Sequence, residues 1–303
     1  MSKTIYLEKT DSAATLTTWW FCHAAMMWAA EQLGFNDVYI NWEQGHTPPR
    51  SLQAYEDAGM KNPNQFEWYF RQPKLITTPP KREYCDIWTW EHHNWDSGLD
   101  VSPYQFMSQP LSVIKDYYQK HLHFNDETNR RGQEIVDKYG IDFSKTIGAT
   151  WRGSDIFLES LNGNSGRKYT NIELYYPWID KALEAIPDAR IAATAEESEI
   201  LDPLFKRYGQ RCFKIHEFYQ VPKGSQFNPE RISPISGYLR GLQPALMVWL
   251  FSKTAWLIKN RASTSAAASW LNNGHIVNIN HNEVLGFPPH MEGVEYKGKI
   301  YPQ

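Results

Sequence analysis

An arginine stands directly after a short apolar run in the middle of the chain. The run Lys145–Trp151 predicts a buried strand, and the polar turn Arg152-Gly153-Ser154-Asp155 follows it. Ligands of open α/β sheets bind at the carboxyl ends of strands, and a planar guanidinium suits a phosphate. In the simpler interpretation, Arg152 forms an ion pair with Asp155 and braces the turn. The spacing therefore predicts either an anion site or a braced turn.

A second candidate is the segment Asn260–Ser265, N-R-A-S-T-S, which brings the small hydroxyl residues Ser263, Thr264 and Ser265 to the start of an alanine-rich segment. It lies between a predicted strand (Ala255–Asn260) and a predicted helix (Ser263–Asn273). Such residues cap a helix, but the first-turn N–H groups and the positive end of the helix also bind phosphate. Together with Arg152, this helix start describes two walls of a diphosphate pocket.

Familiar nucleotide-binding motifs are missing from the sequence. No G-x-G-x-x-G follows the first strand and no G-x-x-x-x-G-K-[ST] occurs, which disfavours NAD binding and P-loop chemistry. There is also no D-x-D, the usual means of holding a divalent metal beside a sugar nucleotide. A nucleotide-sugar site that neutralises the diphosphate with arginine and a helix dipole fits what remains.

The segment Trp88–Asp96 concentrates histidine, tryptophan and acidic residues. His92 and His93 are adjacent and cannot both face one way, and no third ligand follows at a fitting spacing, so we predict no metal site. The rings of Trp88, Trp90 and Trp95 either stack on sugar faces or pack the loop onto the domain. We predict that this loop contacts the acceptor, the molecule that would receive the sugar.

The elements that would position these residues are of α/β type. A helix (His23–Leu33) and a strand (Val38–Trp42) open the chain, residues 43–110 indicate long functional loops, and two helices follow over 110–140. After that, strands and helices alternate, which is typical of βαβ units in a parallel sheet. We predict two Rossmann-like domains that face each other across a cleft, with boundaries 1–145 and 146–303. The expected strands of the second half are Lys145–Trp151, Arg190–Ala195, Arg211–Phe218, Ala255–Asn260 and His275–Asn280; the expected helices are Ile172–Ile186, Glu196–Gly209, Tyr238–Lys253 and Ser263–Asn273.

Composition narrows the class of protein. The 303 residues allow two domains, and a net charge of −3 gives no drive toward nucleic acid. Three cysteines far apart favour a reducing compartment, and neither a signal-peptide core nor a membrane-length apolar run occurs, so a cytoplasmic location is expected. The sequence has 13 tryptophans, an unusually large number. Five of them fall in predicted helices and strands and are expected in hydrophobic cores: Trp151, Trp178, Trp249, Trp256 and Trp270.

The two phosphate-site segments resemble the fucosyltransferase superfamily that includes the nodulation and core α-1,6-fucosyltransferases and the protein O-fucosyltransferases. The family motif G-V-H-V-R-R-T-D aligns with Gly148–Asp155, and L-D-I-H-F-L-S-Q-A-D-F-L-V-C-T-F-S-S aligns with Leu246–Ser263. Residues Ile191–Gly209 are similar to the A-T-D-D-P segment, and the opening helix and strand fit the first domain. The resemblance covers the C-terminal half well and residues 43–110 hardly at all.

The resemblance implies a GT-B-like pair of domains, with the donor bound mainly by the second and the acceptor facing the first. It implies inversion without metal or cofactor, from a GDP-sugar that is usually GDP-fucose, to a glycan hydroxyl. Arg152 and Ser263 carry over as ligands of the β-phosphate. Thr150, Met247, Thr264 and Ser265 complete the expected donor site, and the expected acceptor-side residues are Trp42, Glu43, His92, His93, Trp95 and Asp96.

Three positions depart from the family pattern. Thr150 stands for the motif histidine, Gly153 for its second arginine, and Met247 for the aspartate that reads guanine. No acidic residue occurs from Arg231 to Asn282, so a shifted alignment does not restore that carboxylate. Its loss removes a charge-assisted hydrogen bond worth about 1.5–3 kcal/mol, unless backbone carbonyls or Gln243 replace it. The phosphate site is a firmer expectation than the base or the sugar.

The base that takes the proton from the acceptor hydroxyl has several candidates. Glu159 lies near the place of the catalytic glutamate in the core enzymes, one residue out of register, and Asp155 lies nearer the motif. Glu43 and Asp96 are candidates from the facing domain. Two alternatives to a fucosyltransferase stay open: the same fold with a different nucleotide-sugar donor, or a glycan- or nucleotide-binding protein without turnover.

Overall fold

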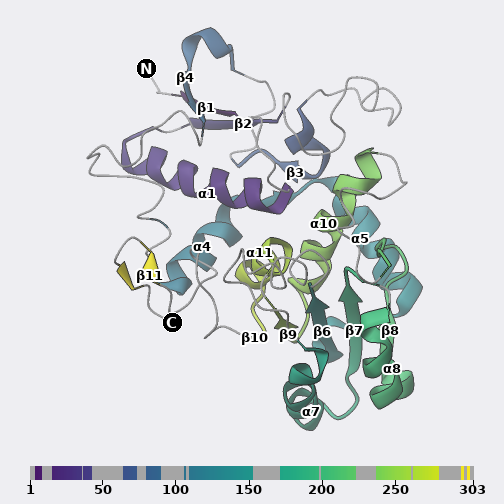
Figure 1. The fold of residues 1–303 in the computed structure, drawn as a ribbon. Coiled ribbons are helices and arrows are strands. Elements are labelled where there is room, and N and C mark those ends of the chain that lie inside the picture. Colours follow the sequence, from purple (N-terminus) through teal and green to yellow (C-terminus); the bar gives the residue numbers. More distant parts are fainter. Residues whose placement is uncertain are drawn as a thin grey trace. The chain divides into compact units, whose positions relative to one another are not determined.

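In the computed structural model of the chain, the residues described are 4–8, 16–35, 37–42, 64–73, 80–89, 106, 109–152, 171–197, 199–222, 237–260, 262–279, 295–296 and 299–300. They form two compact units, one of residues 1–130 with 235–245 and one of residues 131–234 with 246–303. This division falls inside helices α5 (Asp126–Tyr139) and α10 (Gly237–Phe251) (Figure 1). The single boundary predicted near residue 145 stays a prediction.

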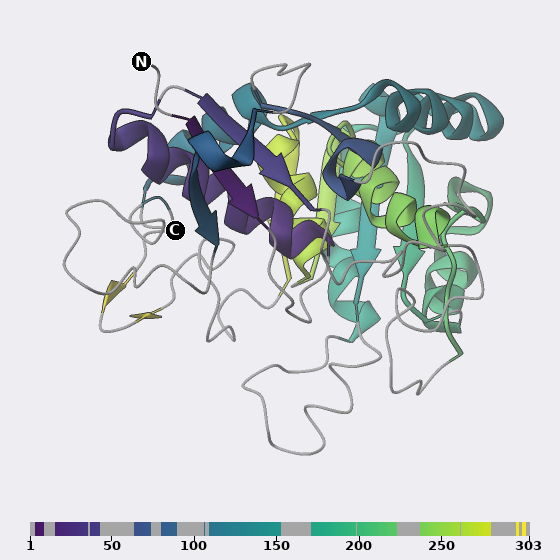
Figure 2. The same ribbon diagram turned by 90° about the horizontal axis from the view of Figure 1, so that it is seen from above.

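The first unit contains a parallel sheet in the order β2-β1-β4. Its strands are β1 (Thr4–Glu8), β2 (Asp37–Asn41) and β4 (Asp86–Thr89). Helix α1 (Leu16–Gln32) packs along this sheet (Figure 2), and the chain turns at Gly34, whose φ of 81° suits glycine. The unit also contains a smaller antiparallel pair, β3 (Phe70–Arg71) with β5 (His123–Phe124), and helix α4 (Leu111–His121).

The second unit contains a five-stranded parallel sheet in the order β10-β9-β6-β7-β8. The first of these strands in the sequence, β6, is central; β7 and β8 follow on one side of it, and β9 and β10 on the other. This is the doubly wound Rossmann arrangement, and its topological switch point lies between β6 and β9. The α/β class with a parallel sheet is therefore confirmed. The strands are β6 (Thr146–Trp151), β7 (Arg190–Ala195), β8 (Cys212–Lys214), β9 (Trp256–Lys259) and β10 (His275–Asn278).

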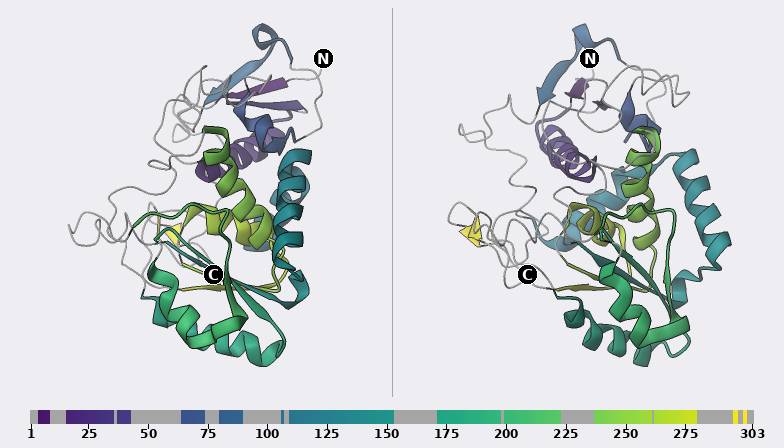
Figure 3. Two further views of the ribbon diagram at one scale, coloured as in Figure 1. Left: turned by 90° about the vertical axis from the view of Figure 1, so that its right-hand side faces the viewer. Right: turned by 45° about the vertical axis from the view of Figure 1, so that its right-hand side comes forward.

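Helices cover both faces of this sheet (Figure 3). Helices α7 (Tyr176–Ala185) and α8 (Asp202–Tyr208) lie on one face, and α10 and α11 (Ser263–Leu271) lie on the other. Alternate residues of β6 divide between the faces because successive side chains of a strand point to opposite sides. Ile147, Ala149 and Trp151 join the core under α7 and α8, whereas Gly148 faces the end of α10. A Cβ at Gly148 would lie 2.7 Å from the ring of Phe251, so this close approach needs glycine.

Four of the five tryptophans predicted in cores are buried: Trp151, Trp249, Trp256 and Trp270. For Trp178 the prediction is wrong, since 40% of this residue is exposed and the Lys181 ammonium lies 5.6 Å from its ring centroid. The reason is the helix face on which it lies. Ile179 and Ala182, three residues apart, form the buried side of α7, and the neighbouring position 178 is turned away from it.

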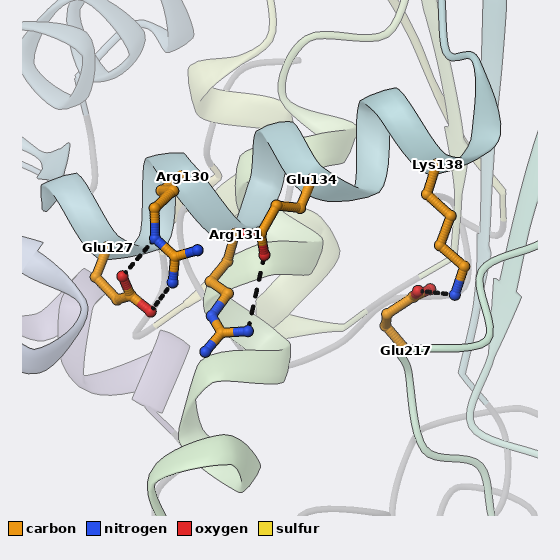
Figure 4. A network of polar contacts seen from close by, with 6 residues as sticks. All are labelled: Glu127, Arg130, Arg131, Glu134, Lys138 and Glu217. Atoms are coloured by element: carbon orange, nitrogen blue, oxygen red, sulfur yellow. Dashed lines mark hydrogen bonds and ion pairs between the residues drawn. The ribbon is translucent and has the colours of Figure 1, made fainter. Parts of the chain in front are cut away.

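Short ion pairs line helix α5 (Figure 4). In its first turns, Arg130 donates two hydrogen bonds to the Glu127 carboxylate, at 2.6 and 2.9 Å. Near its end, the Lys138 ammonium lies 2.6 Å from Glu217 Oε1, and the Tyr139 hydroxyl donates to Glu217 Oε2 at 2.8 Å. Glu217 follows β8, so this last cluster ties the end of α5 to the sheet edge of the second unit.

The Glu217 cluster predicts a pH-dependent contribution to stability. Burial alone would raise the pKa of the Glu217 carboxyl, but hydrogen bonds from Lys138 and Tyr139 outweigh it, and the net pKa is lowered. A lowered folded-state pKa adds stability above the ordinary value of 4.5, and this stability is lost as the pH falls through the folded-state pKa. We expect Glu217→Gln to lower the free energy of unfolding by less than about 1 kcal/mol near neutral pH, because the partners are largely exposed.

Urea unfolding of wild type and Glu217→Gln between pH 3 and pH 7 measures this difference. It should shrink toward zero at the acid end. A difference that stays constant across the range would show that the carboxylate charge is not the cause.

Candidate functional site

The point where the strand order reverses brings the two predicted phosphate-site segments together. The Arg152 backbone N–H donates to Asn260 Oδ1 at 2.9 Å, and Asn260 Nδ2 donates back to the Arg152 carbonyl at 2.7 Å. These residues are 108 positions apart in the sequence, and Asn260 is 3% exposed. A buried side-chain amide that satisfies both backbone groups of a residue on the neighbouring strand fixes the two strand ends to each other. Asn260 is the first residue of the second candidate segment, but the sequence pattern assigned it no role of its own.

The Arg152 side chain is paired with a carboxylate that the sequence did not suggest. Its Nε lies 3.4 Å from Glu196 Oε1, with the two side chains 17% and 20% exposed. Glu196 follows β7, the strand next to β6. Asp155, the bracing partner predicted from the sequence, lies outside the described residues. The Glu196 contact holds the guanidinium at the carboxyl end of the central strand, and it also offsets the charge there.

Helix α11 begins without a side-chain cap. Its N-cap residue is Ala262, with φ −154° and ψ 148° and no capping hydrogen bond from a side chain. Ser265 is buried and its hydroxyl donates to the carbonyls of Asn260, at 3.0 Å, and Ala262, at 3.1 Å. The N-cap position is therefore taken by Ala262 and not by one of the hydroxyl residues, and the Ser265 hydroxyl binds carbonyls that precede it instead of capping the helix. Ala262 has no side-chain oxygen to accept from the N–H groups of the first turn, and helix N-termini bind anions through such groups.

Three polar residues form a row across the central strands at the same edge. Thr150 is in register with Thr194 on β7 and with Lys259 on β9. All three are buried, and the Thr150 hydroxyl oxygen has no hydrogen-bond partner among the residues that the structure describes. The Thr150 carbonyl accepts a hydrogen bond from the buried Tyr175 hydroxyl at 2.8 Å, which holds the backbone of this row in place. Thr150 thus lies beside the site, and its predicted role in donor binding stays a prediction.

The other expected donor residues are only partly described. Met247 and Gln243 are partly exposed on α10, and Thr264 is partly exposed in the first turn of α11. Their roles stay predictions. Ser263 is the first residue of α11, but its side chain lies outside the described residues. The predicted residues that also lie outside them are Gly153, Asp155, Glu159, Glu43, His92, His93, Trp95 and Asp96.

Trp42, expected on the acceptor side, has a packing role. It is fully buried, and its indole N–H donates to His23 Nδ1 at 3.0 Å. The rings of Phe66 and Phe70 meet it edge-on at 5.1 and 6.1 Å between centroids. Trp42 therefore has no exposed surface for the predicted contact with the acceptor, because it follows β2 and its side chain lies in the core of the first unit.

Neither a metal centre nor a membrane span is found in the part of the chain that the structure describes. No three His, Cys, Asp or Glu side chains gather there in a way that could hold a metal ion. None of its helices combines the length and the apolar character needed to cross a bilayer. Neither Cys85 nor Cys212, the two cysteines whose side chains are described, is part of a disulfide bond.

The sheet order defines a Rossmann-like arrangement. Comparison with solved structures finds a similar fold in fucosyltransferases. The chain matches NodZ α-1,6-fucosyltransferase soaked with GDP-fucose at a TM-score of 0.51 and 11% identity, over 95% of this chain and 98% of that one. Matches to POFUT1 with GDP-fucose (TM-score 0.47, 8% identity, 90% and 97% covered) and to a variant of Arabidopsis thaliana FUT1 with GDP (0.49, 9%, 92% and 70%) have lower scores.

At this identity the match to NodZ concerns the fold. A fucosyltransferase-like fold, predicted from two motifs, is thereby confirmed. No protein-family model matches the sequence, and comparison with curated proteins gives no match. The GT-B arrangement of the two domains stays a prediction.

Proposed function

We propose that the chain is a glycosyltransferase that moves a sugar, by default L-fucose from GDP-fucose, to a glycan hydroxyl. The observation that carries the proposal is the joined pair at the β6–β9 switch point. There, Asn260 binds the backbone of Arg152, and α11 begins without a side-chain cap just beyond it. The likeness of the fold to NodZ, whose crystals were soaked with GDP-fucose, supports a GDP-sugar donor.

In the proposed reaction the acceptor hydroxyl oxygen attacks the anomeric carbon while the bond from that carbon to the β-phosphate oxygen breaks. The sugar is transferred with inversion, the diphosphate leaves with the bonding electron pair, and the hydroxyl proton passes to a carboxylate. Negative charge grows on the leaving oxygen, where the Arg152 guanidinium and the N–H groups of the first turn of α11 would stabilise it. Glu159 is the first candidate for the base, before Asp155, Glu43 and Asp96.

Metal independence belongs to the same proposal. A guanidinium and a helix N-terminus carry the charge that a divalent ion would otherwise neutralise, and the nucleotide sugar is a substrate, so no cofactor is required. We further propose a GT-B arrangement, in which the first domain faces the acceptor, and a cytoplasmic location.

A second candidate function is the same transfer from a different nucleotide sugar. Met247 favours it, because a thioether on α10 cannot accept the hydrogen bonds that a carboxylate takes from guanine. The proposed phosphate site does not distinguish one base from another, so Arg152 and α11 would have the same role with either nucleotide sugar.

Thermal-shift and calorimetric titration with GDP, UDP, dTDP and ADP distinguish the two. A ligand at about 100 times its Kd adds about 2.7 kcal/mol to the free energy of unfolding, which is a readily measured shift. We expect GDP to stabilise the protein most. Selective stabilisation by UDP or dTDP would favour the second candidate, and no stabilisation by any of the four would overturn the proposal.

Turnover needs a separate measurement. Incubation with GDP-fucose and a panel of oligosaccharide acceptors should release GDP and form a glycosylated product. Binding of GDP-fucose with no release of GDP on any acceptor would favour a binding protein without turnover.

A further inference from the structure

Two side-chain amides cover the outer edge of β2, an edge strand of the sheet in the first unit. Among the strands that the structure describes, β2 pairs with β1 alone. On its other side, the Ile40 N–H donates to Gln72 Oε1 at 2.9 Å, and Gln72 Nε2 donates to the Ile40 carbonyl at 2.8 Å. A residue of an antiparallel neighbouring strand would exchange the same two hydrogen bonds with Ile40. Gln72 therefore takes the place of a strand at this position.

Asn64 covers the next part of the same edge. Its Oδ1 accepts a hydrogen bond from the Trp42 N–H at 2.8 Å, and its Nδ2 donates to the Ile40 carbonyl at 2.7 Å. Ile40 and Trp42 are two positions apart, so their backbone groups point to the same side of the strand. Asn64 is also the N-cap of a short 3₁₀ helix, η1 (Gln65–Trp68), where Oδ1 accepts from the Phe66 N–H at 3.1 Å. This helix start holds the Asn64 side chain against β2.

The carboxylate of Glu67 fixes the orientation of both amides. Its Oε1 accepts a hydrogen bond from Gln72 Nε2 at 2.8 Å and lies 3.5 Å from Asn64 Nδ2. It also accepts from the Tyr39 hydroxyl at 3.1 Å, and that hydroxyl accepts from Asn64 Nδ2 at 3.2 Å. A carboxylate only accepts, so it attracts the NH₂ group of each amide and leaves each amide oxygen to face a backbone N–H of β2. Asn64 and Gln72 are 3% and 4% exposed, so water does not compete for these hydrogen bonds.

An open edge would expose β2 to pairing with another chain. Edge strands with unpaired N–H and C=O groups are templates for pairing between chains, and proteins protect them in several ways. The centre of β2 is Val38-Tyr39-Ile40, three uncharged residues with high β propensity. Two copies related by a twofold axis present the same edge to each other, so β2 would pair antiparallel with itself. That pairing needs the Ile40 and Trp42 backbone groups that the two amides occupy.

We propose that Asn64 and Gln72 form an edge clamp, a pair of side chains that closes β2 against pairing with β2 of a second copy of this chain. Without the clamp, the backbone groups of Ile40 and Trp42 find partners in the second copy, because polar groups left without hydrogen bonds are costly. The clamp and the edge that it covers lie in the first unit. The inference therefore does not depend on the nucleotide site proposed in the second unit.

Replacing Gln72 with leucine, a side chain of similar size without an amide, tests the clamp. Light scattering coupled to size-exclusion chromatography should show the average mass of Gln72→Leu rising toward that of a dimer as the protein concentration increases, whereas the mass of wild type stays constant. Hydrogen exchange of the peptide that covers β2 should be faster than in wild type at low concentration and become slow again as the dimer forms. This second measurement identifies β2 as the strand that pairs.

Two further variants complete the test. Asn64→Ser removes both hydrogen bonds to β2 but keeps an N-cap side chain for η1, so it should associate in the same way even if Gln72→Leu does not fold. Asn272→Leu is the matched control, since Asn272 is also a buried amide that donates to backbone carbonyls, but in the second unit. It should lower the melting temperature and leave the mass of the protein unchanged.

The inference fails on any of three results. If Gln72→Leu and Asn64→Ser both keep the wild-type mass at every concentration, the open edge does not pair. Association of Asn272→Leu to the same degree would make lower stability the cause. Association of the two clamp variants without slower exchange of the β2 peptide would place the contact on another surface. Each of these results would leave the proposed function intact.

Discussion

Replacing Arg152 with alanine should lower kcat for sugar transfer by about 10²–10³, the usual effect of losing one preorganised donor to a developing negative charge. The side chain is only 17% exposed, so little water screens its charge. Its carboxylate partner, Glu196, is a further reason to expect a strong effect. Without the guanidinium, that carboxylate remains at the strand ends and repels the diphosphate. GDP affinity should therefore fall as well. Steady-state kinetics and calorimetry measure the two effects.

The ion pair gives this prediction an internal check. In the double variant Arg152→Ala with Glu196→Gln the repulsion is gone, so GDP affinity should recover in part while kcat stays low. Arg207→Ala is the matched control, because Arg207 forms an exposed ion pair with Asp180 in the same unit, at 2.7 Å. Transfer by Arg152→Ala at the wild-type rate would remove the phosphate role of this arginine.

Replacing Asn260 with leucine should both destabilise the protein and weaken GDP binding. The backbone N–H and carbonyl of Arg152 lose their partner, which costs about 1–3 kcal/mol in the free energy of unfolding when such groups are left unpaired. The strand end that carries Arg152 is then no longer tied to the strand that leads into α11. We expect the loss of GDP affinity to persist at low temperature, where the variant is fully folded. Urea unfolding and calorimetry provide both numbers.

Asn272 offers a matched control for this variant. It is also a fully buried asparagine whose Nδ2 donates to backbone carbonyls, those of Phe251 and Thr254, but it lies beyond the end of α11. Asn272→Leu should lower stability by a similar amount and leave GDP affinity of the folded protein unchanged. If both variants change GDP affinity equally, the link between Asn260 and the site is not specific.

Most of the second unit could be predicted from the sequence, because its strands are apolar runs bounded by helices and turns. The strand Arg190–Ala195 was predicted with its observed bounds, and β6 and β9 differ from their predictions only at the ends. Strand β8 is shorter than predicted, Cys212–Lys214 instead of Arg211–Phe218, because it is an edge strand with a single neighbour and its pairing with β7 stops at Lys214, opposite Ala193.

The first unit was harder to predict. Strand β1 was missed because five residues near a chain end carry too short a pattern, and β4 falls within sequence that indicates loops. Their strand character comes from pairing, since β1 is central and hydrogen-bonds to both neighbours. Helix α1 begins at Leu16, seven residues before the predicted start at His23.

The sequence predicted the groups proposed to bind the phosphates, but not the residues that hold those groups in place. Arg152 and the start of α11 follow from where two strands end, which apolar patterns locate well. Glu196 and Asn260 depend on which strands are neighbours, and no local pattern tells that β9 lies beside β6.

The central claim is that a nucleoside diphosphate binds at the β6–β9 switch point, and a crystal structure of the chain with the diphosphate that stabilises it most tests this directly. We predict the β-phosphate within hydrogen-bond distance of the Arg152 guanidinium and of the N–H groups in the first turn of α11. A nucleotide bound at any other place, with no contact to Arg152, would contradict the account.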